Sequence, residues 1–236
     1  MYFDAHTHLN ADELFNQRQE EVAQFKNKWW VGLINSGSNH IYNTRALNIA
    51  AESWNIFEDI DIKSTIGLHP YEVSIGNITA ENLHHKLQEL KGLYTPDHKD
   101  LIVAIGEIGI DTHFPGSEST LSLQKELFWL QCERARSCDL PVVIHSRAHR
   151  EATRDILKNY TDLSVYFHCR SYDIEQLQTI QQHFSKYYIG FDANISYANA
   201  KNIRKSLWYL AYASTDYPPH IITWNIPTTS RTPPQV

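Results

Sequence analysis

Two histidines near the start of the chain have the spacing of a metal-binding pair. His6 and His8 stand in the stretch YFDAHTHLN, directly after a short apolar run. Side chains two residues apart on a β-strand point to the same side, so both imidazoles could reach one cation. Chance alone supplies about 0.7 such pairs in a chain of 236 residues with 13 histidines. The pair therefore indicates a metal site only if other ligand-type residues join it.

Further side chains of that type end later apolar runs of the sequence. They are His69 in GLHP, Glu107 in AIGEIGID, His145 and Arg147 in PVVIHSR, His168 in VYFHC, and Asp216 in STDYP. An acidic residue inside an apolar run, such as Glu107, has a large desolvation cost unless a cation or hydrogen bonds compensate it. Pairing with an Arg or Lys would also compensate it, and a lone strand-end histidine can simply be hydrogen bonded. Three successive runs that end in ligand types favour an imidazole–carboxylate metal site.

Such a site requires elements that bring these ends together. Short apolar runs alternate with helical patterns almost throughout, which gives about eight candidate strands, seven of them followed by a candidate helix. The candidate strands are residues 2–6, 31–37, 63–70, 101–109, 140–147, 163–169, 186–191 and 207–215. The candidate helices are residues 11–28, 41–54, 79–92, 119–138, 148–160, 173–184 and 199–207. This rhythm, near the usual ~250 residues, predicts a (β/α)8 TIM barrel, in which active-site groups project from the C-terminal strand ends. The alternative is an open doubly wound sheet, which usually carries a Gly-rich turn after the first strand, and none is present here.

The last part of the chain breaks the rhythm. From Leu207 onward only Asp216 and Arg231 carry charge, and prolines and threonines accumulate. No helical pattern follows the eighth candidate strand, so the sequence predicts an atypical or missing eighth barrel helix. We expect one barrel domain over residues 1–236, in which residues 207–236 are an atypical C-terminal segment.

The composition limits the possible partners and location. The formal net charge is −6 and the pI is about 6.1, so strong unaided attraction to nucleic acid or to an anionic membrane is not expected. Three cysteines with no zinc-type spacing suggest reduced thiols. Polar residues interrupt any leader-like start, and no run approaches the roughly 18 apolar residues of a membrane span. We expect a soluble, cytoplasmic protein.

Six motifs together resemble the TatD family of metal-dependent deoxyribonucleases, which are amidohydrolase-like TIM barrels. FDAHTHL, GLHP, AIGEIGID, PVVIHSR, FHC and TDYP occur in that family's order and spacing, and the match runs from residue 2 to about residue 205. The resemblance implies two divalent metal ions (Mg, Mn or Zn), with Glu107 bridging them. The ligands that it implies are His6, His8, Glu107, His145, His168 and Asp216. The chain departs from the family with Arg170 after FHC, with STD in place of ETD, with a shortened segment before Asp216, and without the closing helix.

The resemblance also implies a mechanism. Two cations about 4 Å apart can clamp an in-line phosphoryl displacement and supply the nucleophile from water. Glu107 and Asp216 would be catalytic, with Asp216 taking the proton from the attacking water, while Arg147 and His69 would contact the phosphate. Tyr71 and Phe114, on loops at the same mouth, could stack on bases or form an apolar lid. Because the net charge is negative, we expect action on single-stranded or terminal DNA, as an exonuclease would act.

Other functions also fit parts of the pattern. A PHP-type phosphoesterase also starts with an H-x-H strand, although its further motifs come in a different order. A carboxylated lysine of the phosphotriesterase type is disfavoured because the fourth candidate strand offers Glu107 and no lysine. A D-aminoacyl-tRNA deacylase remains possible by family association. The altered C-terminal segment also allows a barrel with a disabled site that acts as a binding protein.

Overall fold

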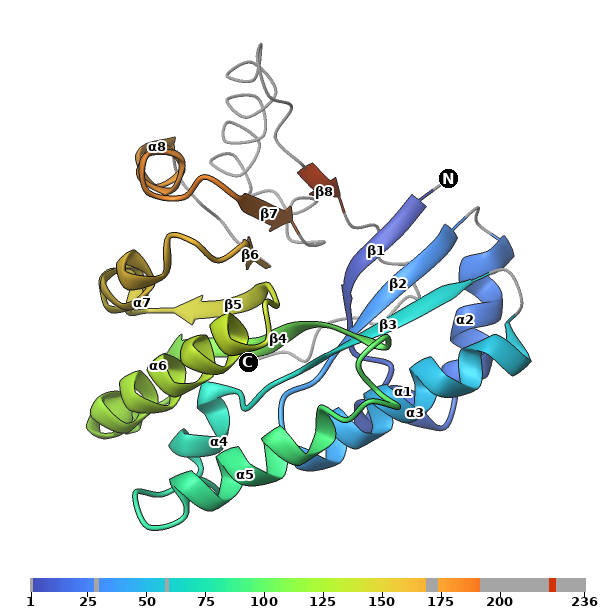
Figure 1. The fold of residues 1–236 in the computed structure, drawn as a ribbon, viewed down its shortest axis with the longest axis horizontal. Coiled ribbons are helices and arrows are strands. Elements are labelled where there is room, and N and C mark those ends of the chain that lie inside the picture. The colour runs from blue at the N-terminus through green and yellow to red at the C-terminus, as the bar shows by residue number, and fades with distance from the viewer. Residues whose placement is uncertain (1, 28–29, 58–59, 169–173, 192–220, 224–236) are drawn as a thin grey trace.

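Eight parallel strands form one sheet in the order of the chain (Figure 1). The computed structural model describes residues 2–27, 30–57, 60–168, 174–191 and 221–223. β8 pairs with β7, and its Cα atoms come within 8 Å of those of β1, so the sheet curves round until its first and last strands are neighbours. The predicted TIM barrel is thereby confirmed. The strands are β1 Tyr2–Thr7, β2 Trp30–Ser36, β3 Asp61–Ile66, β4 Ile102–Asp111, β5 Val142–Arg147, β6 Val165–Phe167, β7 Tyr187–Phe191 and β8 Ile221–Thr223.

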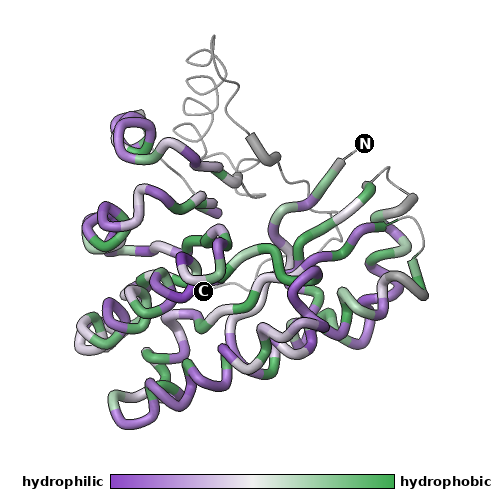
Figure 2. Tube along the Cα trace, viewed as in Figure 1, coloured by the Kyte–Doolittle hydropathy of each residue, from purple (hydrophilic) through white to green (hydrophobic). Residues whose placement is uncertain are grey.

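Helices connect these strands along the outside of the sheet (Figure 1). They alternate apolar and polar residues along their length, as expected of helices with one face against a sheet (Figure 2). None of the helices in the described ranges is long and apolar enough to cross a bilayer. The helices are α1 Asp12–Phe15, α2 Arg18–Asn27, α3 His40–Ile56, α4 Pro70–Ser74, α5 Leu83–Leu93, α6 Leu121–Ser137, α7 Arg150–Leu157 and α8 Ile174–His183, with 3-10 turns at Ser117–Thr120 (η1) and Lys158–Tyr160 (η2).

The helix boundaries differ most from the expectations in two places. The helix expected over residues 11–28 is divided into α1 and α2. The short helix α4 begins at Pro70, and it was expected to be part of a loop. Proline favours the first turn of a helix, because its missing N–H has no partner there in any case. The helix expected over residues 199–207 lies outside the described residues.

The eighth strand is not where the apolar run at residues 207–215 predicted it. That run lies outside the described residues, and the eighth strand of the sheet is Ile221–Thr223. Asp216 therefore precedes this strand in the chain and does not follow it. An apolar run alone does not identify a strand, whereas Ile221, Ile222 and Thr223 are all β-branched and so favour extended backbone. An eighth helix would follow residue 223 and so lies outside the description too.

The core fills the space between the strands and the helices. Its largest cluster joins Ile105 of β4 and Ile144 of β5 to Leu127 and Phe128 of α6. β4 is buried over nearly its whole length, as the apolar run AIGEIGID suggests for a strand covered on both faces. Glu107 lies on this buried strand, and its own side chain is shielded from solvent as well.

Two buried glutamines of α6 fasten the loops that follow β3 and β4. Gln131 accepts a hydrogen bond from the backbone N–H of Leu68 (2.8 Å) and donates one to the carbonyl of Leu68 (3.0 Å). Gln124 makes the same kind of pair with the backbone of Asp111, at 2.9 and 3.0 Å. The two glutamines are seven residues apart, about two helical turns, so they lie on one face of α6. One helix thus fixes two strand ends at once.

Replacing Gln131 with Leu tests this fastening. The change keeps the volume of the side chain but leaves the N–H and C=O of Leu68 buried without partners. We expect the free energy of unfolding to fall by about 1–3 kcal/mol for each of these two groups, measured by urea denaturation. The matched control is Gln88→Leu on the exposed face of α5, for which little change is expected. Equal stability of the two variants would contradict the fastening role.

Candidate metal centre

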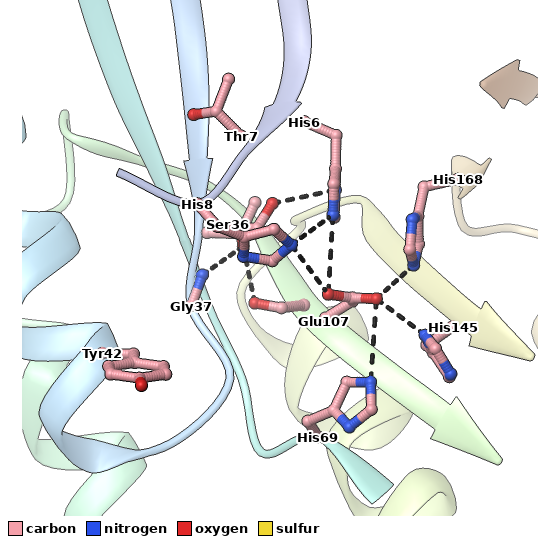
Figure 3. Close-up of polar contacts among 12 residues, drawn as sticks. His6, Thr7, His8, Ser36, Gly37, Tyr42, His69, Glu107, His145 and His168 are labelled. Atoms are coloured by element: carbon pink, nitrogen blue, oxygen red, sulfur yellow. Dashed lines mark hydrogen bonds and ion pairs between the residues drawn. The ribbon is translucent and has the colours of Figure 1, made fainter. Parts of the chain in front are cut away.

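The carboxylate of Glu107 lies at the centre of a cluster of imidazoles (Figure 3). Glu107 stands in the middle of β4, not at its end as the sequence suggested, and it is only 3% exposed. Its Oε1 lies 2.8 Å from Nδ1 of His145 and also contacts Nε2 of His168. Within the described ranges, the ion-pair partners of Glu107 are all histidines, so an Arg or Lys partner is not found there. They are His6, His8, His69, His145 and His168.

The end of β1 holds His6 and His8 in place. The backbone N–H of His6 donates to Oδ1 of the buried Asp4 (3.0 Å). Nδ1 of His6 lies 3.0 Å from the hydroxyl of Ser36, the last residue of β2. A proton on that Nδ1 leaves the lone pair of Nε2 directed at the cluster. Nε2 of His8 then lies 3.0 Å from Nε2 of His6, and both lie within 3.7 Å of Glu107 Oε2.

His145 lies between two carboxylates, one of which the sequence analysis missed. Its Nδ1 faces Glu107, and its Nε2 lies 2.9 Å from Oδ2 of Asp111. Asp111 ends β4, is 2% exposed, and accepts the backbone N–H of His113 at 2.8 Å. The sequence could have indicated Asp111, because it stands four positions after Glu107 and side chains an even number of positions apart tend to lie on the same face of a strand. The ionised Asp111 accepts a hydrogen bond from Nε2–H of His145, which leaves Nδ1 facing the centre.

His69 has the opposite arrangement of protons. It precedes α4, and its Nδ1 accepts the backbone N–H of Tyr71 at 3.0 Å. The neutral ring then carries its proton on Nε2, 3.8 Å from Glu107 Oε1. His69 therefore presents a hydrogen-bond donor to the cluster, whereas Nδ1 of His145 can bind a cation when it gives up its proton.

Glycines allow β4 to pass close to its neighbours at Glu107. A Cβ on Gly106 would lie 2.5 Å from the Cβ of Val143 on β5. Gly109 has φ +143°, and a Cβ there would strike the carbonyl oxygen of His145. The two glycines of the GEIG stretch thus bring the carboxylate of Glu107 and the ring of His145 together across adjacent strands.

Burial and neighbouring charge set the protonation of the centre. Burial raises the pKa of Glu107, but His168 and His6 outweigh it and hold that pKa well below its usual range. Burial lowers the pKa of His69 to about 3 and that of His168 well below its usual value. The pKa of His8 is lowered too, by desolvation and by the neighbouring His6. An ionised carboxylate thus lies among largely neutral imidazoles, the form in which a ring nitrogen can bind a metal.

His145 is the exception in this cluster. Burial lowers its pKa, but the hydrogen bonds to Asp111 and Glu107 outweigh the burial and raise it. The two carboxylates thus favour positive charge at His145, either as a proton on Nδ1 or as a cation in its place.

The structure brings most of the predicted site residues together. Two sets of ligand-type atoms, each within 4.8 Å of one another, share Glu107: one adds His6 and His168, the other His69 and His145. Arg147 lies opposite Asp111 in the β4–β5 register and is exposed. Within the described ranges its side chain makes no hydrogen bond or ion pair. Asp216 lies outside the described residues.

The chain matches known proteins over most of its length. The family model of TatD-related DNases matches residues 3–215. A Mycoplasma pneumoniae protein called an uncharacterized metal-dependent hydrolase is 29% identical over 87% of this chain and 75% of its own. The 3'-5' ssDNA/RNA exonuclease TatD of Pantoea is 25% identical over 75% of this chain and 62% of its own. Among solved structures, the TatD homologue YjjV of Escherichia coli is similar with a TM-score of 0.73, at 22% identity over 87% of this chain and 73% of that one.

Proposed function

The chain belongs to the family of TatD-related DNases, and from this we propose that it cleaves phosphodiester bonds in DNA at two divalent metal ions held around Glu107. That the chain is a metal-dependent hydrolase follows from the family and from its relatives. The number of ions, their identity among Mg, Mn and Zn, and the preference for single-stranded or terminal DNA belong to the proposal. Its main support is the buried, ionised Glu107 with five imidazoles around it and no Arg or Lys ion-pair partner in the described ranges.

The nitrogen and oxygen atoms of the cluster are arranged better for binding a cation than for hydrogen bonding to one another. Nε2 of His6 and Nε2 of His8 lie 3.0 Å apart. At this distance their two lone pairs repel each other unless one nitrogen carries a proton or both bind a cation. His145 is hydrogen bonded to Glu107 through Nδ1 at 2.8 Å and to Asp111 through Nε2 at 2.9 Å, and a cation could take the place of the proton on Nδ1. A divalent cation satisfies both arrangements, and mixed imidazole and carboxylate donors are those that Zn and Mn accept.

The proposed ligands divide between the two carboxylate oxygens of Glu107. The ion-pair contacts of His6 and His8 are with Oε2, whereas those of His145 and His168 are with Oε1, and His6 and His168 also form one ligand set with Glu107 within 4.8 Å. Glu107 would thus bridge the two ions, and Asp216 would complete the ligands from the C-terminal segment. When bound, two such ions lower the pKa of water and stabilise charge on both the attacking and the leaving oxygen.

The other site residues act on the phosphate and on protons. Asp216 would accept the proton of the attacking water as the new P–O bond forms and the bond to the leaving oxygen breaks. Nε2–H of His69 would donate a hydrogen bond to a phosphate oxygen or to the water network. Arg147, exposed and unpaired in the described part of the chain, would fork onto a phosphate oxygen pair.

The three alternatives gain no support from the comparisons. The matching family model is that of TatD-related DNases and not that of a PHP phosphoesterase. A D-aminoacyl-tRNA deacylase and a disabled binding protein likewise find no counterpart among the relatives described above. We further propose that residues 1–236 form a single domain that works in the cytoplasm, in keeping with the free thiols of Cys132 and Cys138.

Removing metal ligands gives the direct test. Glu107→Ala and His6→Ala should each lose bound metal, counted by mass spectrometry. They should also cut a labelled single-stranded oligonucleotide at least about 100-fold more slowly in Mg²⁺ or Mn²⁺, because metal stabilisation amounts to several kcal/mol. His84→Ala, at an exposed position of α5, is the matched control. No bound metal and no cleavage by the unaltered chain with any cation would refute the proposal. Normal activity of Asp216→Asn would exclude the C-terminal segment from the site.

Asp111 offers a second test, of the outer partner of a ligand. In Asp111→Asn the side-chain amide can donate to Nε2 of His145, which moves the ring proton to Nδ1 and removes the lone pair from the centre. We expect metal affinity to fall about 10- to 100-fold, measured by competition with a chelator. Asp97→Asn, at an exposed position after α5, should leave metal affinity unchanged. Equal affinity in the two variants would show that Asp111 does not orient His145.

A further inference from the structure

We propose that Tyr71 and Phe114 form a stacking platform for an unpaired base of the DNA strand whose phosphate lies at the Glu107 cluster. This inference rests on the proposed function and adds the substrate feature that the site would recognise. The two rings are in contact, with centroids 4.9 Å apart and planes inclined by 54°. Tyr71 nevertheless remains 39% exposed and Phe114 38% exposed. Each ring therefore still offers apolar surface to a third partner.

The platform is attached directly to the centre. Tyr71 is two residues beyond His69, so their Cα atoms are at most about 8 Å apart. Its backbone N–H is the donor that fixes the His69 ring. Phe114 is three residues beyond Asp111, the partner of His145, so those Cα atoms are at most about 11 Å apart. A base on these rings would belong to a nucleotide near the phosphate bound at the cluster.

Buried hydrogen bonds hold the two segments that carry these rings. Gln124, which is fully buried, donates to the hydroxyl of Ser74 on α4 (3.1 Å) and to the carbonyl of Asp111 at the end of β4 (3.0 Å). The carbonyl of Phe114 accepts the backbone N–H of Ser117 at 3.1 Å. Because the segments are already fixed, a base would bind without the entropy loss of ordering loops. Stacking on such rings requires a base that is not paired in a duplex.

The other large exposed aromatic side chains in the described ranges lack this setting. Phe3 lies near the opposite end of β1 from the histidines, and Trp129 lies within α6. Neither follows the C-terminal end of a strand. A lid formed by Tyr71 and Phe114 would act as an apolar cover, and it would make no distinction between a nucleotide that has a base and one that lacks it. Binding of DNA with and without the base at that position therefore distinguishes an apolar lid from a stacking platform.

The experiment compares intact and abasic DNA. The probe is a fluorescent single-stranded oligonucleotide and a set of versions with one abasic residue at each of the three terminal positions. Binding is measured by anisotropy in the presence of Mg²⁺, and KM and kcat are measured separately. Phe114→Ala should weaken binding of intact DNA and raise its KM about 5- to 100-fold, as expected for the loss of one stacked base, with kcat changed much less. Tyr71→Ala should act in the same direction, because its backbone contact with His69 remains.

The abasic probes separate stacking from a structural effect. One abasic position should weaken binding to the unaltered protein to a similar degree but should have little further effect on Phe114→Ala. Phe114→Tyr should restore the preference for a base, and Trp129→Ala should behave as the unaltered protein. The platform would be overturned if the losses of binding caused by Phe114→Ala and by the abasic residue multiplied when combined. Unchanged binding by both alanine variants would overturn it as well. Base-dependent binding without cleavage would refute the hydrolase and leave the platform standing, whereas no DNA binding at all would overturn both.

Discussion

The buried carboxylate of Glu107 is the constraint on which the site depends. An ionised group that is 3% exposed is stable only when charge or hydrogen bonds replace the water it has lost. That compensation comes from five imidazoles carried by β1, β5 and the segments after β1, β3 and β6. These elements are far apart in the sequence, and only a curved parallel sheet brings them to one point. Glu107 can therefore be buried as an ionised group only because this fold brings the imidazoles to it.

The second nitrogen of each ring decides what the first one can do. Nδ1 of His6 lies against a hydroxyl, Nε2 of His145 against a carboxylate, and Nδ1 of His69 against a backbone N–H. A carboxylate can only accept, so it keeps a proton on Nε2 of His145 and leaves the inner nitrogen as the one that can exchange its proton for a cation, whereas a backbone N–H can only donate, so it leaves a proton on the inner nitrogen of His69. Two rings of identical chemistry that face the same oxygen of Glu107, at 2.8 and 3.8 Å, are thus suited to different tasks: His145 to binding a cation and His69 to donating a hydrogen bond.

The sequence predicted the barrel and the histidine cluster because both depend on short patterns. Strand ends that carry His or Glu are visible in the alternation of apolar runs and helices. Asp111 was missed because the end of β4 lies beyond the apolar run, and hydrogen bonds to Gln124 from a distant helix define that end. The eighth strand is Ile221–Thr223 and not the apolar run at residues 207–215, because a short apolar run does not by itself distinguish a strand from a helix. Asp216 was linked to the site by family resemblance, and local pattern alone could not have placed it.

The net charge of −6 determines how a polyanion could be held at this site. Affinity for duplex DNA comes largely from Lys and Arg side chains that displace counterions from the phosphates. At the Glu107 cluster the described part of the chain offers Arg147 as an exposed guanidinium, and the imidazoles are mostly neutral. Attraction must then come from bound cations at one point and from apolar ring faces beside it. Both contacts need a flexible strand that can bend a phosphate inward and turn a base outward, which a duplex permits only at an open end. The electrostatics that favour a metal site at this centre are therefore also the basis of the proposed preference for single-stranded or terminal DNA.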